Sequence, residues 1–344
     1  MEHRKLGRTG LEVSCTGLGT EYLSNQSGET INDVLRIAVE AGINYIDLLW
    51  DNPVWWGNFE PVFKQYRNRF TLAAHWGGDL NQMDLCQQYF DGILSRLCNG
   101  YAEVGMITMI DTDVKWKGCA QEALERLRRY KEQGRTGAIG VSSHRAPIAL
   151  KVVNSGAIDV LMYQVNLFRH GSDENGALFR ACAEHGVGLV AMKPYAGGGV
   201  FVKPPPITPT HCIAYVLSQP VSTTVTGVKS AAELEAALHY WKASDDEKDY
   251  SSILDNIQHY LLGDCVYCNH CLPCSQGINV GSMIQMIDTA QYFSLDEVMA
   301  EYATIPVKAS ACTECGECME RCPFDVDVVA KMRAAVGFFE ANTA

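Results

Sequence analysis

The stretch of residues 30–48, TINDVLRIAVEAGINYIDL, holds one complete unit of the predicted fold. Apolar residues recur with a helical period over residues 30–41, and Gly42 follows where a helix of this length would end. Residues 44–48 then form a short apolar run that is typical of a strand buried on both faces. The stretch therefore predicts a helix that leads directly into a strand of a parallel sheet.

The same alternation extends over most of the chain. Strands are predicted at residues 14–19, 44–48, 70–75, 104–109, 138–141, 160–164, 188–193 and 223–227. Helices are predicted between them, at residues 30–41, 83–97, 120–133, 174–185 and 231–240. Eight strands alternating with helices predict an α/β protein with a (β/α)₈ TIM barrel. Residues 4–13 precede this pattern and predict a hairpin that closes the bottom of the barrel.

The length of 344 residues and the charge of the chain limit its organisation and its partners. Single hydrophobic cores usually stop growing at roughly 250–300 residues, so we expect a barrel at 1–244 and a second, mostly helical domain at 245–344. A net charge of −12 argues against a nucleic-acid partner or an anionic membrane surface. No leader is evident at the N-terminus and no apolar run reaches the roughly 18 residues of a membrane span, so we expect a cytoplasmic protein.

Eight of the 14 cysteines lie in two tight groups near the C-terminus. The second group reads C-x₂-C-x₂-C-x₃-C-P, the run by which bacterial ferredoxins hold [4Fe-4S] clusters. Its members are Cys312, Cys315, Cys318 and Cys322. The first group is one residue shorter before its fourth cysteine, and its members are Cys265, Cys268, Cys271 and Cys274. Two such groups predict two [4Fe-4S] clusters.

In the ferredoxin run, the fourth cysteine ligates the other cluster. Ligand exchange of this kind assigns one cluster to Cys265, Cys268, Cys271 and Cys322. It assigns the other cluster to Cys312, Cys315, Cys318 and Cys274. The alternative is zinc, which usually takes paired cysteines separated by a longer loop.

The chain resembles the aldo-keto reductase family, specifically the members with a C-terminal ferredoxin-type [4Fe-4S] module. The resemblance covers nearly the whole chain and rests on several short motifs in a fixed order. These are RKLGRTGL at 4–11, GLGT at 17–20, GINYID at 42–47, GVSSH at 140–144, KP at 193–194 and GVKS at 227–230. In that family a nicotinamide nucleotide lies across the mouth of the barrel, and an Asp-Tyr-Lys-His tetrad reduces carbonyl groups.

The resemblance also shows where this chain departs from the family. The Asp of the tetrad is Asp47, while Asn52, His75 and Thr108 stand at the positions of Tyr, Lys and His. An amide cannot replace a phenol as a proton donor, so we expect an altered mechanism. His75 is the predicted acid or base, because imidazole gains and loses a proton near neutral pH. We expect Asp47 to orient it and Asp111 to add a second carboxylate; loop caps and a core histidine are the structural alternatives.

The resemblance further implies how NADP or NAD would bind at the barrel mouth. Contacts to the phosphates are expected from Gly197, Gly198, Gly199, Lys229 and Ser230. Contacts to the carboxamide are expected from Ser142, Ser143 and Gln164. The remaining matched positions of the nucleotide site are Thr20, Lys193, Gly227 and Glu233. Four tryptophans near the mouth, Trp50, Trp55, Trp56 and Trp76, favour a planar or ring-bearing substrate. The alternative is that they pack in the core under long loops.

Together these features predict an oxygen-sensitive iron-sulfur oxidoreductase. It would pass electrons between its clusters and a small-molecule substrate or nicotinamide nucleotide in the barrel, with ferredoxin or another electron carrier as its partner. Two alternatives remain open. One is an NAD(P)H-dependent carbonyl reductase whose clusters are structural, and the other is a non-catalytic electron-transfer subunit.

Overall fold

The computed structural model describes residues 1–23, 26–49, 56–170, 173–201, 207–261, 263–267, 270–290 and 294–341. The chain forms two compact units. The first comprises Met1–Leu167 and Glu174–Tyr250, and the second comprises Phe168–Asp173 and Ser251–Ala344. None of the described helices is long and apolar enough to cross a membrane.

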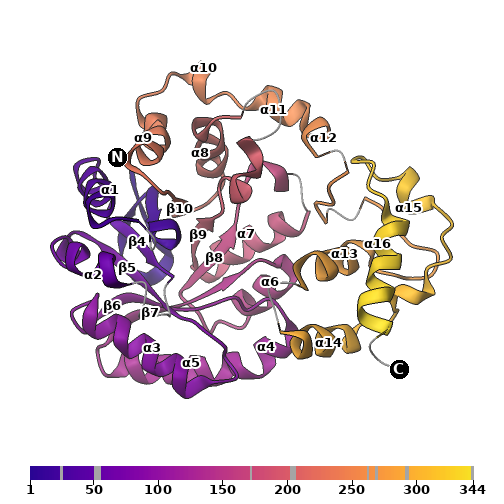
Figure 1. The fold of residues 1–344 in the computed structure, drawn as a ribbon, viewed down its shortest axis with the longest axis horizontal. Coiled ribbons are helices and arrows are strands. Elements are labelled where there is room, and N and C mark those ends of the chain that lie inside the picture. Colours follow the sequence, from indigo (N-terminus) through magenta and orange to yellow (C-terminus); the bar gives the residue numbers. More distant parts are fainter. Residues whose placement is uncertain are drawn as a thin grey trace. The chain divides into compact units, whose positions relative to one another are not determined.

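The first unit is a closed barrel of parallel strands in the order β10-β3-β4-β5-β6-β7-β8-β9 (Figure 1). The strands are β3 Thr16–Gly19, β4 Tyr45–Leu48, β5 Thr71–Trp76, β6 Ala102–Ile107, β7 Thr136–Ser143, β8 Val160–Gln164, β9 Gly188–Met192 and β10 Thr223–Gly227. The predicted (β/α)₈ barrel is confirmed. All eight carboxyl ends open at one face, which is where barrel enzymes carry their chemistry.

The helices follow the strands as the apolar periodicity predicts. Those of the first unit are α1 Gly28–Glu40, α2 Trp56–Phe63, α3 Met83–Arg96, α4 Asp113–Lys117, α5 Cys119–Glu132, α6 Ala146–Asn154, α7 Asp173–His185, α8 Pro209–Ser218, α9 Ala231–Leu238 and α10 Asp245–Lys248. The Ser27 hydroxyl accepts a hydrogen bond from the Thr30 amide and begins α1. Gly42, with φ of +83°, follows its end.

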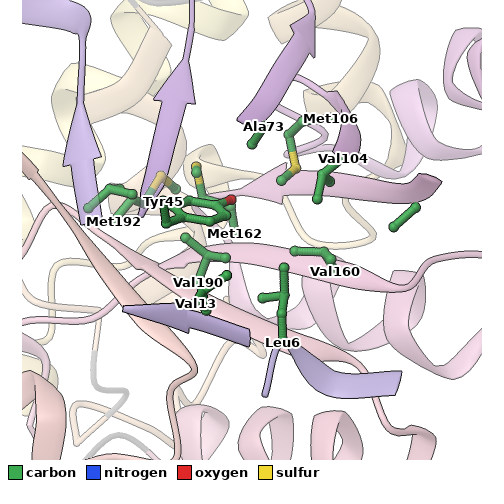
Figure 2. Packing of buried hydrophobic residues seen from close by; sticks show 12 residues of the cluster. Leu6, Val13, Tyr45, Ala73, Val104, Met106, Val160, Met162, Val190 and Met192 are labelled. Atoms are coloured by element: carbon green, nitrogen blue, oxygen red, sulfur yellow. The ribbon is translucent and has the colours of Figure 1, made fainter. Parts of the chain in front are cut away.

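The predicted hairpin closes the bottom of the barrel. Strands β1 His3–Lys5 and β2 Glu12–Ser14 pair antiparallel, and both Leu6 and Val13 are fully buried among the inward-facing strand residues. Figure 2 shows these two side chains beside Val160 and Val190. Gly7 has φ of +53°, and a Cβ there would lie 2.2 Å from the Gly188 amide nitrogen, so no larger residue fits.

Residues between 245 and 250 group with the barrel and not with the second unit. Helix α10 packs on α8, and the ring of Tyr250 lies edge-on to Tyr215 at 5.6 Å. The Tyr250 hydroxyl also donates to the Ser218 Oγ over 2.9 Å. These contacts join residues 245–250 to the barrel, so the first unit ends at Tyr250. The sequence analysis ends the barrel at residue 244.

The second unit consists of short helices joined by turns. They are α11 Ser251–Asp255, α12 Ile257–Tyr260, α13 Val280–Thr289, α14 Leu295–Thr304, α15 Glu317–Glu320 and α16 Val328–Ala335. Helix α13 contacts α16, and each contributes buried residues such as Met283 and Met332. Tyr302 of α14 stacks on Phe339 with ring centroids 4.4 Å apart. This packing supports the loops that carry both cysteine groups.

Candidate functional site

Three of the predicted catalytic residues meet at the ends of adjacent strands. Asp47 lies in β4, His75 lies in β5, and Thr108 directly follows β6. The Nε2 of His75 is 2.8 Å from the Asp47 Oδ1, and its Nδ1 is 2.9 Å from the Thr108 Oγ1. The His75 side chain is 1% exposed and that of Asp47 is 8% exposed. A carboxylate, an imidazole and a hydroxyl therefore form one buried chain.

The chemistry of these groups determines which atom donates and which accepts in each of the two hydrogen bonds. A carboxylate only accepts hydrogen bonds, so the Nε2 of His75 carries a proton and donates it to Asp47. In the neutral ring, Nδ1 then accepts from the Thr108 hydroxyl. The Thr20 hydroxyl donates to the Asp47 carbonyl oxygen over 2.9 Å and holds that residue in place. This arrangement matches the carboxylate-imidazole-hydroxyl order that hydrolytic triads use to move a proton.

Asp111 does not bond to Asp47, His75 or Thr108. It forms a second group of hydrogen-bonded side chains with residues at the end of β7. Its Oδ1 accepts from the Ser143 hydroxyl at 3.0 Å and from the His144 amide at 2.5 Å. Its Oδ2 lies 2.9 Å from the His144 Nδ1. Met109, with φ of +57°, turns the backbone after β6 so that Asp111 reaches these partners. Such strained residues concentrate at functional sites.

The protein holds Asp111 in its charged form. Burial by itself would raise the pKa of this carboxyl, because a charge is poorly solvated inside the protein. The adjacent His144 and the hydrogen bonds from His144 and Ser143 outweigh burial, so the pKa of Asp111 is lowered. Asp111 is only 2% exposed, so these partners replace nearly all of its hydration.

We expect Asp111→Asn to destabilise the barrel by about 2 kcal/mol at neutral pH, the worth of hydrogen bonds to a buried charge. A lowered folded pKa means that the carboxylate stabilises the fold above the unfolded value of about 3.9. That contribution disappears as the pH falls through the folded pKa. Urea unfolding of both proteins between about pH 3 and pH 7 measures the difference.

Asp113→Asn is the matched control, because Asp113 is a partly exposed carboxylate on the same segment that pairs with Lys151. Its loss should change stability by at most about 1 kcal/mol. A stability gap between wild type and Asp111→Asn that stayed constant over the whole pH range would contradict the assignment of charge to Asp111.

The residues expected to bind the carboxamide of a nucleotide have partners within the barrel. The Ser142 Oγ accepts from the Met109 amide at 2.8 Å, and the Ser143 hydroxyl is used by Asp111. The Gln164 Nε2 donates to the His144 carbonyl over 2.7 Å. These side chains therefore stabilise the ends of β7 and β8, whether or not they also contact a ligand.

The expected phosphate-binding residues lie at the ends of β9 and β10. Gly197 and Gly198 have φ of +68° and +90°, and no atom lies within 4 Å of a Cβ built on either. Their backbone is therefore open to close approach by a ligand. Lys193, just after β9, also has a positive φ of +54°. The stretch of Gly197, Gly198 and Gly199 belongs to a short 3₁₀ turn, Ala196–Phe201.

At the end of β10, polar groups surround the start of α9. The Ser230 Oγ accepts from the Glu233 amide, and the Glu233 carboxylate accepts from the Lys229 amide at 2.7 Å. The Lys229 ammonium lies 5.5 Å from the ring centroid of Tyr22. That ring also covers Gly227, where a Cβ would come within 2.8 Å of it. A phosphate bound here would attract the Lys229 ammonium more strongly than the face of the Tyr22 ring does.

Two buried polar atoms near β8 and β9 support a ligand at this end of the barrel. The Oδ1 of Asn166 and the hydroxyl of Tyr195 make no hydrogen bond within the described part of the chain. A buried polar atom without a partner costs about 1–3 kcal/mol. The residues present thus fit a hydrogen-bonding ligand such as a nucleotide.

Comparison with known proteins agrees with this geometry. A sequence model of the Aldo/keto reductase family matches residues 67–204. This span runs from before β5 to beyond β9 and includes His75 and His144. This part of the barrel is similar to the aldo/keto reductase family. Residues outside this span continue the same closed barrel.

Individual proteins that this chain resembles are distant from it in sequence. "Uncharacterized oxidoreductase YqkF" of Bacillus subtilis is 28% identical over 221 residues, 59% of this chain and 68% of that protein. "L-galactose dehydrogenase" of Arabidopsis thaliana is 25% identical over 280 residues, 74% of this chain and 83% of that protein.

Solved structures show the same fold. Aldo-keto reductase AKR11C1 from Bacillus halodurans superposes with a TM-score of 0.60 at 20% identity, over 76% of this chain and 96% of that one. A putative aldo-keto reductase from Pseudomonas aeruginosa gives a TM-score of 0.57 at 21% identity, over 70% of this chain and 95% of that one. These matches leave part of the present chain uncovered.

The cysteine groups lie in the second unit. A pocket that is partly open to solvent is lined by Cys274, Cys312, Cys315 and Cys318, among other residues. Burial raises the pKa of Cys318, and the nearby thiolates of Cys312 and Cys315 raise it further. Cys274 comes from the first group in sequence and the other three from the second. This is the set that ligand exchange predicts for one cluster.

The other set is described in part, because Cys268 lies outside the described residues. The Arg321 guanidinium donates to the carbonyl oxygens of Cys271 and Pro273, at 3.0 and 2.7 Å. Cys322 directly follows Arg321 in sequence, so its backbone is held beside the first group. Near Cys265, the Gly263 amide donates to the Phe324 carbonyl over 2.6 Å. These contacts hold the backbone next to Cys322 beside the first group.

The described residues do not form a metal centre as they stand. No group of three or more His, Cys, Asp or Glu side chains in the described ranges is placed to hold a metal ion. Four cysteines nevertheless line one pocket. Cysteine sulfur is a ligand for both iron-sulfur clusters and zinc.

The tryptophan prediction is not supported where it can be checked. Trp76 is fully buried and packs on Phe90 and Tyr130 in the layer between strands and helices. Trp56 is 2% exposed, with the Arg96 guanidinium over its ring. Both are core residues, because their rings face helices. Trp50 and Trp55 lie outside the described residues, as does Asn52.

Sequence reasoning missed His144 as a site residue. It is part of the GVSSH motif, but its partner Asp111 is 33 residues away. Only the register of β6 against β7, in which Ile107 pairs with Val141, brings them together. A polar residue directly after a predicted strand end was the available signal.

Proposed function

We propose that the protein is an oxidoreductase of the aldo/keto reductase type that uses two [4Fe-4S] clusters to pass electrons to or from a small-molecule substrate in the barrel. The observation that carries this proposal is the pocket lined by four cysteines drawn from both groups. When bound, each cluster supplies one-electron transfer. Cys274, Cys312, Cys315 and Cys318 would hold one cluster, and Cys265, Cys268, Cys271 and Cys322 the other.

In the barrel, this chain's own residues would provide the protons. Asp47 fixes the imidazole of His75, and Thr108 is the outermost member of the chain. Thr108 would touch the substrate. When the His75 ring carries a proton on both nitrogens, Thr108 would pass its hydroxyl proton outward and accept the proton of the His75 Nδ1, which leaves the ring neutral with its remaining proton on Nε2. The burial of His75 keeps water away from the relay. This relay would replace the tyrosine of ordinary family members, whose position is Asn52.

A second candidate is an NAD(P)H-dependent carbonyl reductase with structural clusters. It is favoured by the family of the barrel and by the open backbone at Gly197 and Gly198. Lys229 and Ser230 would hold the phosphates, and the nucleotide would supply hydride when bound. In this case ferredoxin or another external carrier would have no role.

Cluster reoxidation separates the two candidates. Anaerobic protein is reduced with dithionite, freed of excess reductant, and mixed with a panel of ring-bearing aldehydes and ketones, with or without NADPH. For the proposed function, the cluster absorbance returns when a carbonyl compound is added, with about one product per two electrons. For the second candidate, NADPH is consumed by the carbonyl compound while the absorbance stays constant. Reoxidation by no member of the panel would count against the proposal.

A further inference from the structure

We propose that His144 is a second proton-transferring group at the barrel mouth, held by Asp111 and separate from the chain that ends at Thr108. The proposal rests on the proposed function, because it assigns a role in the same reaction. It starts from a difference between the two histidines. The His75 ring is 1% exposed and both of its nitrogens are occupied, whereas the His144 ring is 20% exposed.

The imidazole of His144 is held from one side only. Its Nδ1 lies 2.9 Å from the Asp111 Oδ2, and the carboxylate can only accept there. Its Nε2 has no hydrogen-bond partner among the residues that the structure describes. The ring therefore presents one nitrogen outward while a buried carboxylate fixes the other. An oriented acid or base in an enzyme has this arrangement.

Asp111 is itself fixed more firmly than a loop cap requires. The Ser143 hydroxyl and the His144 amide both donate to its Oδ1, which already satisfies a capping role. The second oxygen is then left for the imidazole alone. Gln164 also holds the His144 carbonyl at 2.7 Å. Because three strand ends contribute to this geometry, the direction of the ring is set by the barrel and not by a mobile loop.

A second proton donor fits the reaction class of the proposed function. Reduction of a carbonyl to an alcohol takes two electrons and two protons, and an external one-electron reductant would supply the electrons through the clusters. The Thr108 chain would supply one proton. The imidazolium of His144 would supply the other: its Nε2–H bond breaks, that electron pair stays on the ring, and the new bond on the substrate uses an electron pair gained in the reduction. Solvent then reprotonates the exposed ring.

The variants are chosen to separate catalysis from structure. His144→Asn keeps an amide that can donate to Asp111 but lacks the outward nitrogen, so a structural role would survive this change. We expect it to lower kcat by about two to four orders of magnitude with little change in KM. His144→Ala should lose as much and regain part of its kcat in millimolar imidazole. His239→Ala, which alters an exposed histidine at the C-terminal end of α9, should keep wild-type activity.

Asp111 is tested as a positioning residue. In Asp111→Asn the new amide can donate to the Nδ1 of His144, which leaves a neutral ring with its proton on Nε2. We expect kcat to fall while KM and cluster content stay constant. Restored activity in Asp111→Glu, which returns the carboxylate, would support this role. Equal activity of Asp111→Asn and wild type would overturn it.

Chemical labelling gives a readout besides turnover. Diethyl pyrocarbonate acylates neutral imidazole nitrogens that it can reach, and peptide mapping by mass spectrometry identifies the site. We expect labelling at His144 and none at His75, and a carbonyl compound that reoxidises the clusters should protect His144. If no compound reoxidises the clusters, the proposed function fails, and protection of His144 by NADP⁺ then decides whether this histidine faces the ligand. Full activity of His144→Asn, or labelling that no ligand blocks, would overturn the inference.

Discussion

Simultaneous replacement of Cys274 and Cys312 by alanine should leave about four of the roughly eight iron ions expected for two [4Fe-4S] clusters. Both residues line the same pocket, although they come from different groups in sequence. Replacement of Cys271 and Cys312 should instead remove nearly all of the iron, because under ligand exchange these residues would hold different clusters. Iron and sulfide are measured on protein purified without oxygen. The comparison tests the exchange of ligands and not only the presence of iron.

Cys212→Ala is the matched control, since this cysteine is fully buried in α8 of the barrel. It should keep all of the iron. The same double variants should destabilise the second unit, because metal-binding free energy contributes to the stability of small metal-bearing domains. Wild-type protein with negligible iron and one or two zinc ions would contradict the cluster assignment. Equal iron loss in the two double variants would contradict the exchange of ligands alone.

His75→Ala should lower turnover by about two to four orders of magnitude, the usual worth of a positioned acid or base. Among the described residues, the imidazole is the titratable group that links Asp47 to Thr108. His75→Gln should be almost as inactive, because an amide forms hydrogen bonds but does not carry a proton. Asp47→Asn should be intermediate if the carboxylate only orients the ring. Turnover is measured with the compound that reoxidises the clusters, at equal iron content.

Thr108 provides the control for folding, because removal of His75 leaves a buried carboxylate without its partner. Thr108→Val keeps the shape of the side chain and loses the hydroxyl, whereas Thr108→Ser keeps the hydroxyl. We expect the valine variant to be as inactive as His75→Ala and the serine variant to be active. If His75→Ala retained full turnover, the relay proposed here would be wrong, and His144 would be the remaining proton donor among the described groups.

The barrel could be predicted from sequence because its pattern is local. Each strand is a short apolar run and each helix has its own periodicity, so residues 160–164 and 223–227 are predicted with the observed bounds. The boundary with the second unit was predicted less well. Charge marked residues 245–249, whereas the packing of Tyr250 on Tyr215 holds this segment on the barrel. Tertiary contacts of this kind leave no periodic signal.

The site was predictable to the extent that parallel strands align their ends. The resemblance to the aldo-keto reductase family matched Asp47, His75 and Thr108 to tetrad positions, and each of these lies at a predicted strand end. It did not separate Asp111 from them, because the left-handed turn at Met109 redirects the loop toward β7. It also did not reveal that the Ser143 hydroxyl donates a hydrogen bond to Asp111. Such partners depend on loop conformation, which residue type alone does not determine.

The assignment of Phe168–Asp173 to the second unit has a consequence for how the protein is made. This segment directly follows β8, yet the Arg169 guanidinium lies over the ring of Tyr267, which stands between Cys265 and Cys268 in sequence. On the ribosome it is synthesised nearly a hundred residues before the tyrosine that it packs on. Neither unit is a continuous piece of chain, so release of the C-terminal residues must precede completion of the second unit. Insertion of iron would then come late, after the barrel strands have been translated.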